Sequence, residues 1–198
     1  MVQTLLSQLT EFIDSNEDIR LNEIPDYRLY ISQLEEFFNK KLGKVSSNEE
    51  DRKTISKTMI QNYIKDGLLM PPDGKSYYRS HVILLILIYN LKPILSIRDI
   101  GRLLHPILSD IYNEENRPDI DYIYESYLSL KQESISGLHS CLEDLAHQVS
   151  NHPLPEGKTI EEQHQIRLLL FISALITEAN FRKRVADFLI EEYFGDEE

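Results

Sequence analysis

The residues with the most definite chemistry lie in one short polar run. Lys57, Thr58, Gln61, Asn62 and Lys65 are spaced so that they share one side of a helix. Glutamine and asparagine amides can each form paired hydrogen bonds to adenine, and a lysine ammonium can reach guanine or a phosphate. The spacing therefore predicts a helix face that contacts DNA.

A second group of polar side chains surrounds the turn-rich segment Pro71–Lys75. Its charges and hydroxyl groups could donate to phosphates, and its members are Lys75, Tyr77, Tyr78 and Arg79. Short apolar stretches on both sides of the turn, at 68–70 and 77–78, predict a small β-hairpin. The tyrosines could equally serve packing, and for Tyr63 in the preceding helix we expect a core position.

Charge is distributed unevenly along the chain. The 198 residues carry a net charge of −12, which is unusual for a nucleic-acid binder because phosphates attract lysine and arginine. The segment from Arg52 to His105, however, contains nine basic and three acidic residues, so its net charge is +6 and that of the remainder is −18. The basic island coincides with the polar run, which favours a nucleic-acid surface there.

Helical elements must position these side chains. Ser56 can cap a helix over 57–66 that Gly67 ends. Ser80 can cap the next helix, and Ser96 with Asp99 resembles a capping box. The sequence predicts five helices in this part of the chain, at 4–14, 27–42, 57–66, 80–91 and 96–104, and Pro106 marks the end of the last one. A polar loop over 44–52 separates the second helix from the third.

The last third of the chain predicts two long helices. Apolar residues alternate at spacings of four and three from Tyr124 to Val149, interrupted only by Lys131, which is typical of a heptad seam. Thr159 and Glu162 form a capping box for a helix to about Tyr193. Its stretch 168–176 is apolar almost all round, so we expect it to be buried. The two helices should pack as an antiparallel hairpin, and the seam serves either packing within the chain or dimerisation.

The basic island resembles two known families. Residues 58–69 are similar to the recognition-helix stretch of MerR-type regulators, which ends in a tyrosine followed closely by Gly-Leu-Leu, here Tyr63 and Gly67-Leu68-Leu69. Pro71-Pro72 with Tyr77-Tyr78-Arg79 resembles their wing, and 91–100 resembles their second helical pair. More closely, 29–33, 56–65 and 78–81 resemble a bacterial family catalogued as domain of unknown function 1836. The resemblance covers about residues 25–106 and implies a winged helix-turn-helix and a DNA-binding role.

Other chemistries have little support. Glu161 and His164 have the spacing of a di-iron ligand pair, but no second such pair occurs, and His139 with Cys141 lacks a partner pair. Phosphate-binding loops, GxSxG elbows and HExxH motifs are missing. No cofactor, metal or enzyme activity is therefore expected. The single cysteine and the short apolar runs predict a cytoplasmic protein outside the membrane.

These observations predict a mainly α protein with a MerR-like winged helix-turn-helix, additional N-terminal helices and a C-terminal long-helix hairpin. The expected domains are an N-terminal helix and linker at 1–26, the winged domain at 27–106 and an acidic helical region at 107–198. The expected function is DNA-binding transcriptional regulation by a homodimer joined through the C-terminal helices, with the effector unknown. Two alternatives remain open: a protein-interaction module that uses the winged fold as a scaffold, and a small-molecule sensor with a pocket beside 168–176.

Overall fold

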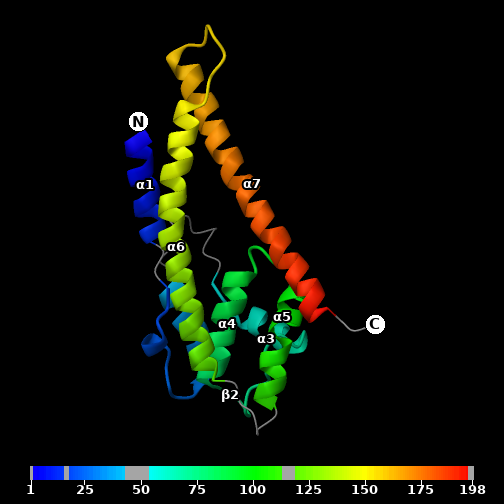
Figure 1. Ribbon diagram of the computed structural model, residues 1–198. Helices are drawn as coiled ribbons and strands as arrows, with labels where there is room; N and C mark the ends of the chain where they lie inside the picture. The colour runs from blue at the N-terminus through cyan, green and yellow to red at the C-terminus, as the bar shows by residue number, and fades with distance from the viewer. Residues whose placement is uncertain (1, 16–17, 43–53, 113–118, 196–198) are drawn as a thin grey trace. The chain divides into compact units, whose positions relative to one another are not determined.

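The computed structural model describes residues 2–15, 18–42, 54–112 and 119–195. It is mainly helical, as the sequence predicts, with little strand (Figure 1). The chain divides into two compact units, one of residues 1–16 and 130–189 and the other of residues 17–129 and 190–198. This division describes packing, and the domain boundaries expected after residues 26 and 106 stay predictions. The predicted loop at 44–52, with Arg52 and Lys53, lies outside the described residues.

The second unit holds the basic island and most of the core. Its central helix is α4 (Arg79–Leu91), in which every side chain from His81 to Ile88 is buried. Such a helix is apolar on all sides and must be covered from several directions. The elements of this unit are η1 (Leu21–Glu23), β1 (Leu29–Tyr30), α2 (Ile31–Leu42), α3 (Lys57–Lys65), β2 (Ser76–Tyr77), α4 (Arg79–Leu91), α5 (Ile97–Tyr112), and short parts of α6 and α7.

The only sheet found among the described residues pairs strands that are distant in sequence. β1 and β2 are antiparallel, with Leu29 opposite Tyr77 and Tyr30 opposite Ser76. The predicted hairpin between 68–70 and 77–78 is therefore wrong in its partner. The predicted start of the second helix at Tyr27 is also wrong, because residues 29–30 extend to pair with β2 before α2 begins.

Two other helix boundaries differ from expectation. The N-cap of α4 is Tyr78 and not Ser80, because the His81 side chain accepts the Tyr78 backbone N–H. Helix α5 continues to Tyr112 with Pro106 inside it, although the sequence predicts an end at that proline. The capping interaction predicted for α5 is present, since the Ser96 Oγ accepts the Asp99 N–H at 3.2 Å.

The first unit packs three helices: α1 (Val2–Asp14), the later part of α6 (Ile120–Asn151) and most of α7 (Ile160–Phe194). Leu142 and Ala146 of α6 are buried against Phe171 of α7, with α1 side chains beside them. The Arg167 guanidinium donates to the carbonyls of Val149 and Ser150. Its positive charge stabilises the C-terminal end of α6, where the helix dipole is negative. Because residues late in α6 meet residues early in α7, the two helices run antiparallel, as predicted.

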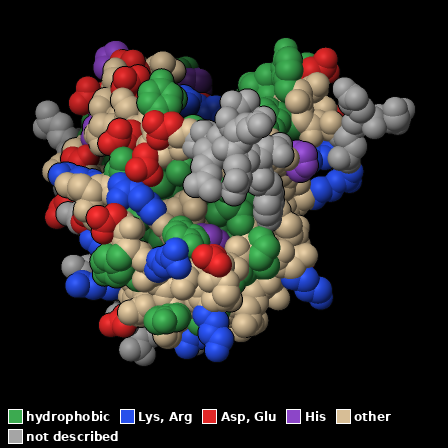
Figure 2. Space-filling model, turned by 90° about the horizontal axis from the view of Figure 1, so that it is seen from below, with side chains coloured by type: hydrophobic (Ala, Val, Ile, Leu, Met, Phe, Trp, Pro, Cys, Tyr) green, Lys and Arg blue, Asp and Glu red, His purple; other side chains and the backbone are tan. Residues whose placement is uncertain are grey.

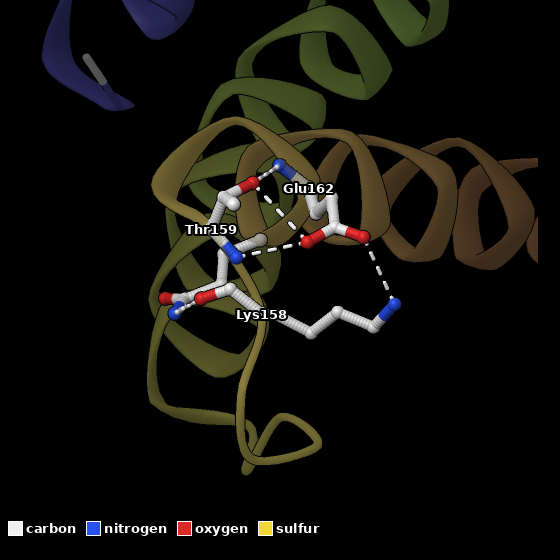
Figure 3. Close-up of polar contacts among 4 residues, drawn as sticks. Lys158, Thr159 and Glu162 are labelled. Atoms are coloured by element: carbon white, nitrogen blue, oxygen red, sulfur yellow. Dashed lines mark hydrogen bonds and ion pairs between the residues drawn. The ribbon is translucent and has the colours of Figure 1, made fainter.

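Local signals fix where α7 starts. The Thr159 Oγ1 accepts the Glu162 N–H at 3.3 Å, and the Glu162 carboxylate accepts the Thr159 N–H at 2.9 Å (Figure 3). Lys158 adds an ion pair to Glu162 at 3.0 Å. This arrangement is the predicted capping box.

The apolar middle of α7 contradicts expectation. The sequence predicts a buried stretch at 168–176, yet only Phe171 is fully buried there. Leu169 is 64% exposed, Ile172 44% and Ile176 56%. The helices of the first unit cover one side of this stretch and leave the other open.

Candidate nucleic-acid interface

Helix α3 is set in place by local signals and by the core. The Ser56 Oγ accepts the Met59 N–H at 3.3 Å, which caps the first turn. Gly67 follows the helix with φ +73°, a left-handed conformation that glycine adopts at low cost. Ile60 and Tyr63 are buried, which confirms the core position predicted for Tyr63. The inner edge of α3 is therefore anchored in the second unit.

The outer face of α3 presents the five residues singled out from the sequence. All of them are exposed: Lys57, Thr58, Gln61, Asn62 and Lys65. With about 1.5 Å of rise per residue, the face extends for roughly 12 Å along the helix. The structure thus brings these five side chains together on one surface, which we call the α3 face.

Two residues that sequence reasoning did not place at the site modify its electrostatics. The Glu35 carboxylate lies 3.4 Å from the Lys57 ammonium and also accepts the Lys57 backbone N–H at 3.1 Å. It therefore offsets part of the charge at the start of α3. The Lys92 ammonium donates to the Tyr63 hydroxyl at 3.2 Å and lies 5.6 Å from the centre of that ring. Lys92 is exposed, so it adds positive charge beside α3.

A tight turn carries Lys75. Asp73 and Ser76 exchange two backbone hydrogen bonds of 3.1 and 3.0 Å around Gly74 and Lys75, and Gly74 has φ +63°. Such a conformation at the first turn position favours glycine. Lys75 is exposed, and Arg28 of the neighbouring segment lies 3.7 Å from the Asp73 carboxylate. The turn is therefore a second exposed basic position.

Tyr77 and Tyr78, two of the residues expected to lie beside the turn, make contacts within the fold. Tyr77 is only 4% exposed and packs edge-to-face on His81, because β2 turns it into the core. The Tyr78 hydroxyl donates to the Asp73 carboxylate at 2.5 Å, and this bond raises the tyrosine pKa. Arg28 lies 5.0 Å from the centre of the Tyr78 ring. Tyr77 is therefore buried, in line with the packing alternative, and the Tyr78 hydroxyl is bonded to Asp73. Contact of these two hydroxyls with phosphates stays a prediction.

Arg79 is likewise committed to the fold. Its guanidinium donates to the carbonyls of Leu21 at 2.9 Å and Ile24 at 3.2 Å, and it forms an ion pair with Asp121 at 3.2 Å. A planar guanidinium suits several acceptors at once. The expected contact of Arg79 with phosphates stays a prediction. In the fold, its guanidinium joins the start of α4 to η1 and α6. The sequence held no signal for this, because its partners lie 42 to 58 positions away.

His81 is a buried titratable group beside β2. It is 3% exposed, and its Nδ1 accepts the Tyr78 backbone N–H at 3.0 Å. Burial lowers its pKa below the usual value of about 6.5. The folded protein therefore holds His81 neutral, with the proton on Nε2.

Protonation of His81 should destabilise the fold. Below about pH 6.5 an unfolded chain binds a proton that the folded chain excludes, so stability falls as pH decreases from 7 to 5. Urea midpoints measured by circular dichroism across this range should decrease, and His81→Gln should show a smaller decrease. Equal pH dependence in both proteins would contradict this role.

Charge on the surface is mixed. Figure 2 shows one face of the molecule, where lysine and arginine side chains are interspersed with acidic and hydrophobic ones. The residues of the α3 face, and not a continuous basic field, are therefore what is typical of a nucleic-acid surface. Among the described residues, no three histidine, cysteine or acidic side chains are grouped to hold a metal ion. Nor does any helix in the described ranges have the length and apolar content to span a bilayer.

Comparison with known proteins gives one match. A family model described as a domain of unknown function (DUF1836) matches residues 19–127, which include η1 to α5 and the start of α6. No curated protein and no solved structure matches the chain.

Proposed function

This chain belongs to the family described as a domain of unknown function (DUF1836), and we propose that it is a DNA-binding regulator that reads the major groove with α3. The observation that carries the proposal is the two-sided character of that helix. Lysine, glutamine, asparagine and threonine side chains are exposed on one side, while Ile60 and Tyr63 hold the other side in the core. A recognition helix needs this combination of a rigid base and a polar reading face.

The chemistry of the α3 face suits base readout together with phosphate contact. Gln61 and Asn62 can each pair with the N6 and N7 atoms of adenine, and the Thr58 methyl group can contact thymine. Lys57 and Lys65 lie near the two ends of the helix, where they can reach phosphates on either side of a groove. Lys92 supplies a further cation beside the helix.

We assign the β1–β2 ribbon and its turn the role of the wing in a winged helix-turn-helix of MerR-like type. Lys75 and Arg28 are its exposed cations and would contact the phosphate backbone. Tyr77 and Arg79 support this element from within and are not part of the contact surface in this proposal. The mixed charge around the turn implies that the α3 face contributes more to affinity than the wing does.

Removing the two lysines of α3 should weaken DNA binding. For Lys57→Ala/Lys65→Ala we expect about 10- to 100-fold weaker affinity, and a decrease of about two in the slope of log affinity against log salt, because two phosphate contacts are lost. Fluorescence anisotropy with labelled genomic fragments, from low to moderate salt, measures both quantities.

The matched control is Lys158→Ala/Arg182→Ala, which removes the same charge from ion pairs with two α7 carboxylates, Glu162 and Glu178. It should leave affinity and salt slope almost unchanged. If the wild-type protein does not bind at low salt, or if both double variants lose affinity equally, the proposal fails.

A second candidate is a protein-interaction module in which the same fold is a scaffold. Exposed apolar side chains on α7 favour it, since contiguous apolar surface usually marks an interaction site. This alternative would be supported over the first if the chain shows no DNA affinity and a pull-down with it recovers one protein partner.

A further inference from the structure

Helix α7 carries an exposed stripe that the fold leaves uncovered. The members of this α7 stripe are all exposed and lie in the first unit: Glu161, Gln165, Leu168, Ile172, Ile176, Ala179 and Lys183. Its apolar centre is substantial, with Leu168 39% exposed, Ile172 44% and Ile176 56%. Leu169, 64% exposed, widens the stripe at one edge.

The spacing of the stripe keeps it on one side of a long helix. Successive members are four, three and four residues apart, and then four, three and four again. This pattern is an 11-residue repeat of about 3.67 residues per turn, close to the 3.6 of a straight α-helix. The stripe therefore runs along α7 for roughly 33 Å and drifts by only about 40° around it.

The packed side of α7 faces elsewhere. Phe171 and Leu175 contact α6 and α1 side chains in the core of the first unit. The Glu178 carboxylate accepts a hydrogen bond from Cys141 of α6 at 3.4 Å. The stripe is thus available to a further partner while these contacts remain in place.

The order of residues makes the stripe complementary to itself. In two copies of α7 placed antiparallel and crossing at Ile172, residues equally distant before and after this position meet. Leu168 then meets Ile176, and Gln165 meets the small Ala179. At each end of the paired stripes, the Glu161 carboxylate of one copy meets the Lys183 ammonium of the other, so a pair of opposite charges lies on both sides of the apolar centre.

We propose that the α7 stripe binds the α7 stripe of a second copy of this chain, antiparallel and centred on Ile172. A parallel arrangement would place Glu161 against Glu161 and Lys183 against Lys183, so charge selects the antiparallel one. Lys183 lies 2.6 Å from Asp187 on its own helix, which holds the ammonium at the end of the stripe. This pairing does not depend on DNA binding by α3.

A second exposed apolar group on α7 supplies an internal control. Phe181 is 60% exposed, Val185 58% and Phe188 64%. At 3.6 residues per turn these three lie on the opposite side of the helix from Ile172. They stay outside the proposed interface.

The molar mass of the full chain in solution tests the pairing. Light scattering after gel filtration at tens of micromolar should give twice the 23.2 kDa of one chain. Ile172→Asp, which places two carboxylates at the centre, should shift the protein to one chain with its helical content unchanged. Val185→Asp should leave the mass at two chains.

The register has its own test. In a Cys141→Ser background, Ile172→Cys should form an intermolecular disulfide with itself under mild oxidation, because the two residues meet at the crossing point. Val185→Cys in the same background should not. Glu161→Lys should weaken association, and adding Lys183→Glu should restore it.

Three outcomes would overturn the proposal: a wild-type mass of one chain, a mass of two chains that Val185→Asp abolishes and Ile172→Asp does not, or crosslinking at Val185 without crosslinking at Ile172. DNA affinity measured on Ile172→Asp separates the two proposals. If Ile172→Asp has the mass of one chain and still binds DNA through α3, the pairing is supported and DNA binding does not require it.

Discussion

Replacing Tyr124 with alanine should destabilise the protein by about 3–5 kcal/mol, the usual cost of deleting a large ring from a core. Tyr124 of α6 has no exposed surface, and its ring stacks on Tyr127 with 6.2 Å between centres. Its hydroxyl donates to the Ile19 carbonyl at 2.6 Å. The ring thus connects α6 with the chain segment that precedes η1.

Urea unfolding followed by circular dichroism measures this loss. Tyr124→Phe keeps the ring and removes one buried hydrogen bond, so it should cost only about 1–2 kcal/mol. If the alanine and phenylalanine variants are equally stable, the ring contributes no packing and the expectation is wrong.

The same residue predicts an alkaline limit to stability. Burial raises the pKa of Tyr124 far above 10, and burial also raises the pKa of Tyr127 and Tyr77. An unfolded chain releases tyrosine protons near pH 10 and the folded chain keeps them. Stability is therefore complete below pH 10 and falls above it, by up to about 1.4 kcal/mol per pH unit for each such tyrosine. Tyr124→Phe should reduce this slope.

Replacing Arg79 with alanine should cost about 2–3 kcal/mol. The loss removes an ion pair to Asp121 and leaves the carbonyls of Leu21 and Ile24 without the guanidinium donor. Charged hydrogen bonds contribute about 1.5–3 kcal/mol each, and solvent screening lowers their sum here because the side chain is 26% exposed. The melting temperature should fall by roughly 4–12 °C for a chain of this size.

Two variants make the Arg79 result specific. Arg79→Lys retains the charge but a single ammonium cannot reach all three acceptors, so it should recover less than half of the loss. Lys75→Ala removes one exposed charge from the nearby turn and should change stability by less than about 0.5 kcal/mol. If Arg79→Ala is as stable as wild type and binds DNA more weakly, the arginine faces the nucleic acid after all.

Helix α3 could be predicted from the sequence, whereas the partner of strand β1 could not. Ser56 and Gly67 act within a few residues of the helix that they bound, so the bounds of α3 and its exposed face could be predicted. The pairing of Leu29 with Tyr77 joins residues far apart in the chain, and no local pattern selects that partner over 68–70. The buried position of Tyr77 goes with this pairing, and for this tyrosine the sequence left packing open. The contacts of Arg79 were missed because its partners are distant in sequence.

The middle of α7 shows another limit. An almost uniformly apolar stretch indicates that the helix needs cover on all sides, but it does not say which chain supplies the cover. Phe171 is covered within its own unit, whereas Ile172 and Ile176 are not. The sequence predicted that this surface is buried and that the C-terminal helices join a homodimer, without saying which residues serve which contact.

The uninterrupted burial of α4 has a consequence for what happens outside the native state. Val82 to Ile88 contains seven consecutive aliphatic side chains, without charge, proline or glycine. In a helix they are sealed on every side, but in a nascent or denatured chain they form an extended segment able to stack with copies of itself into cross-β aggregates. The segment that contributes most to the core is thus also the one that the cell must shield until folding is complete.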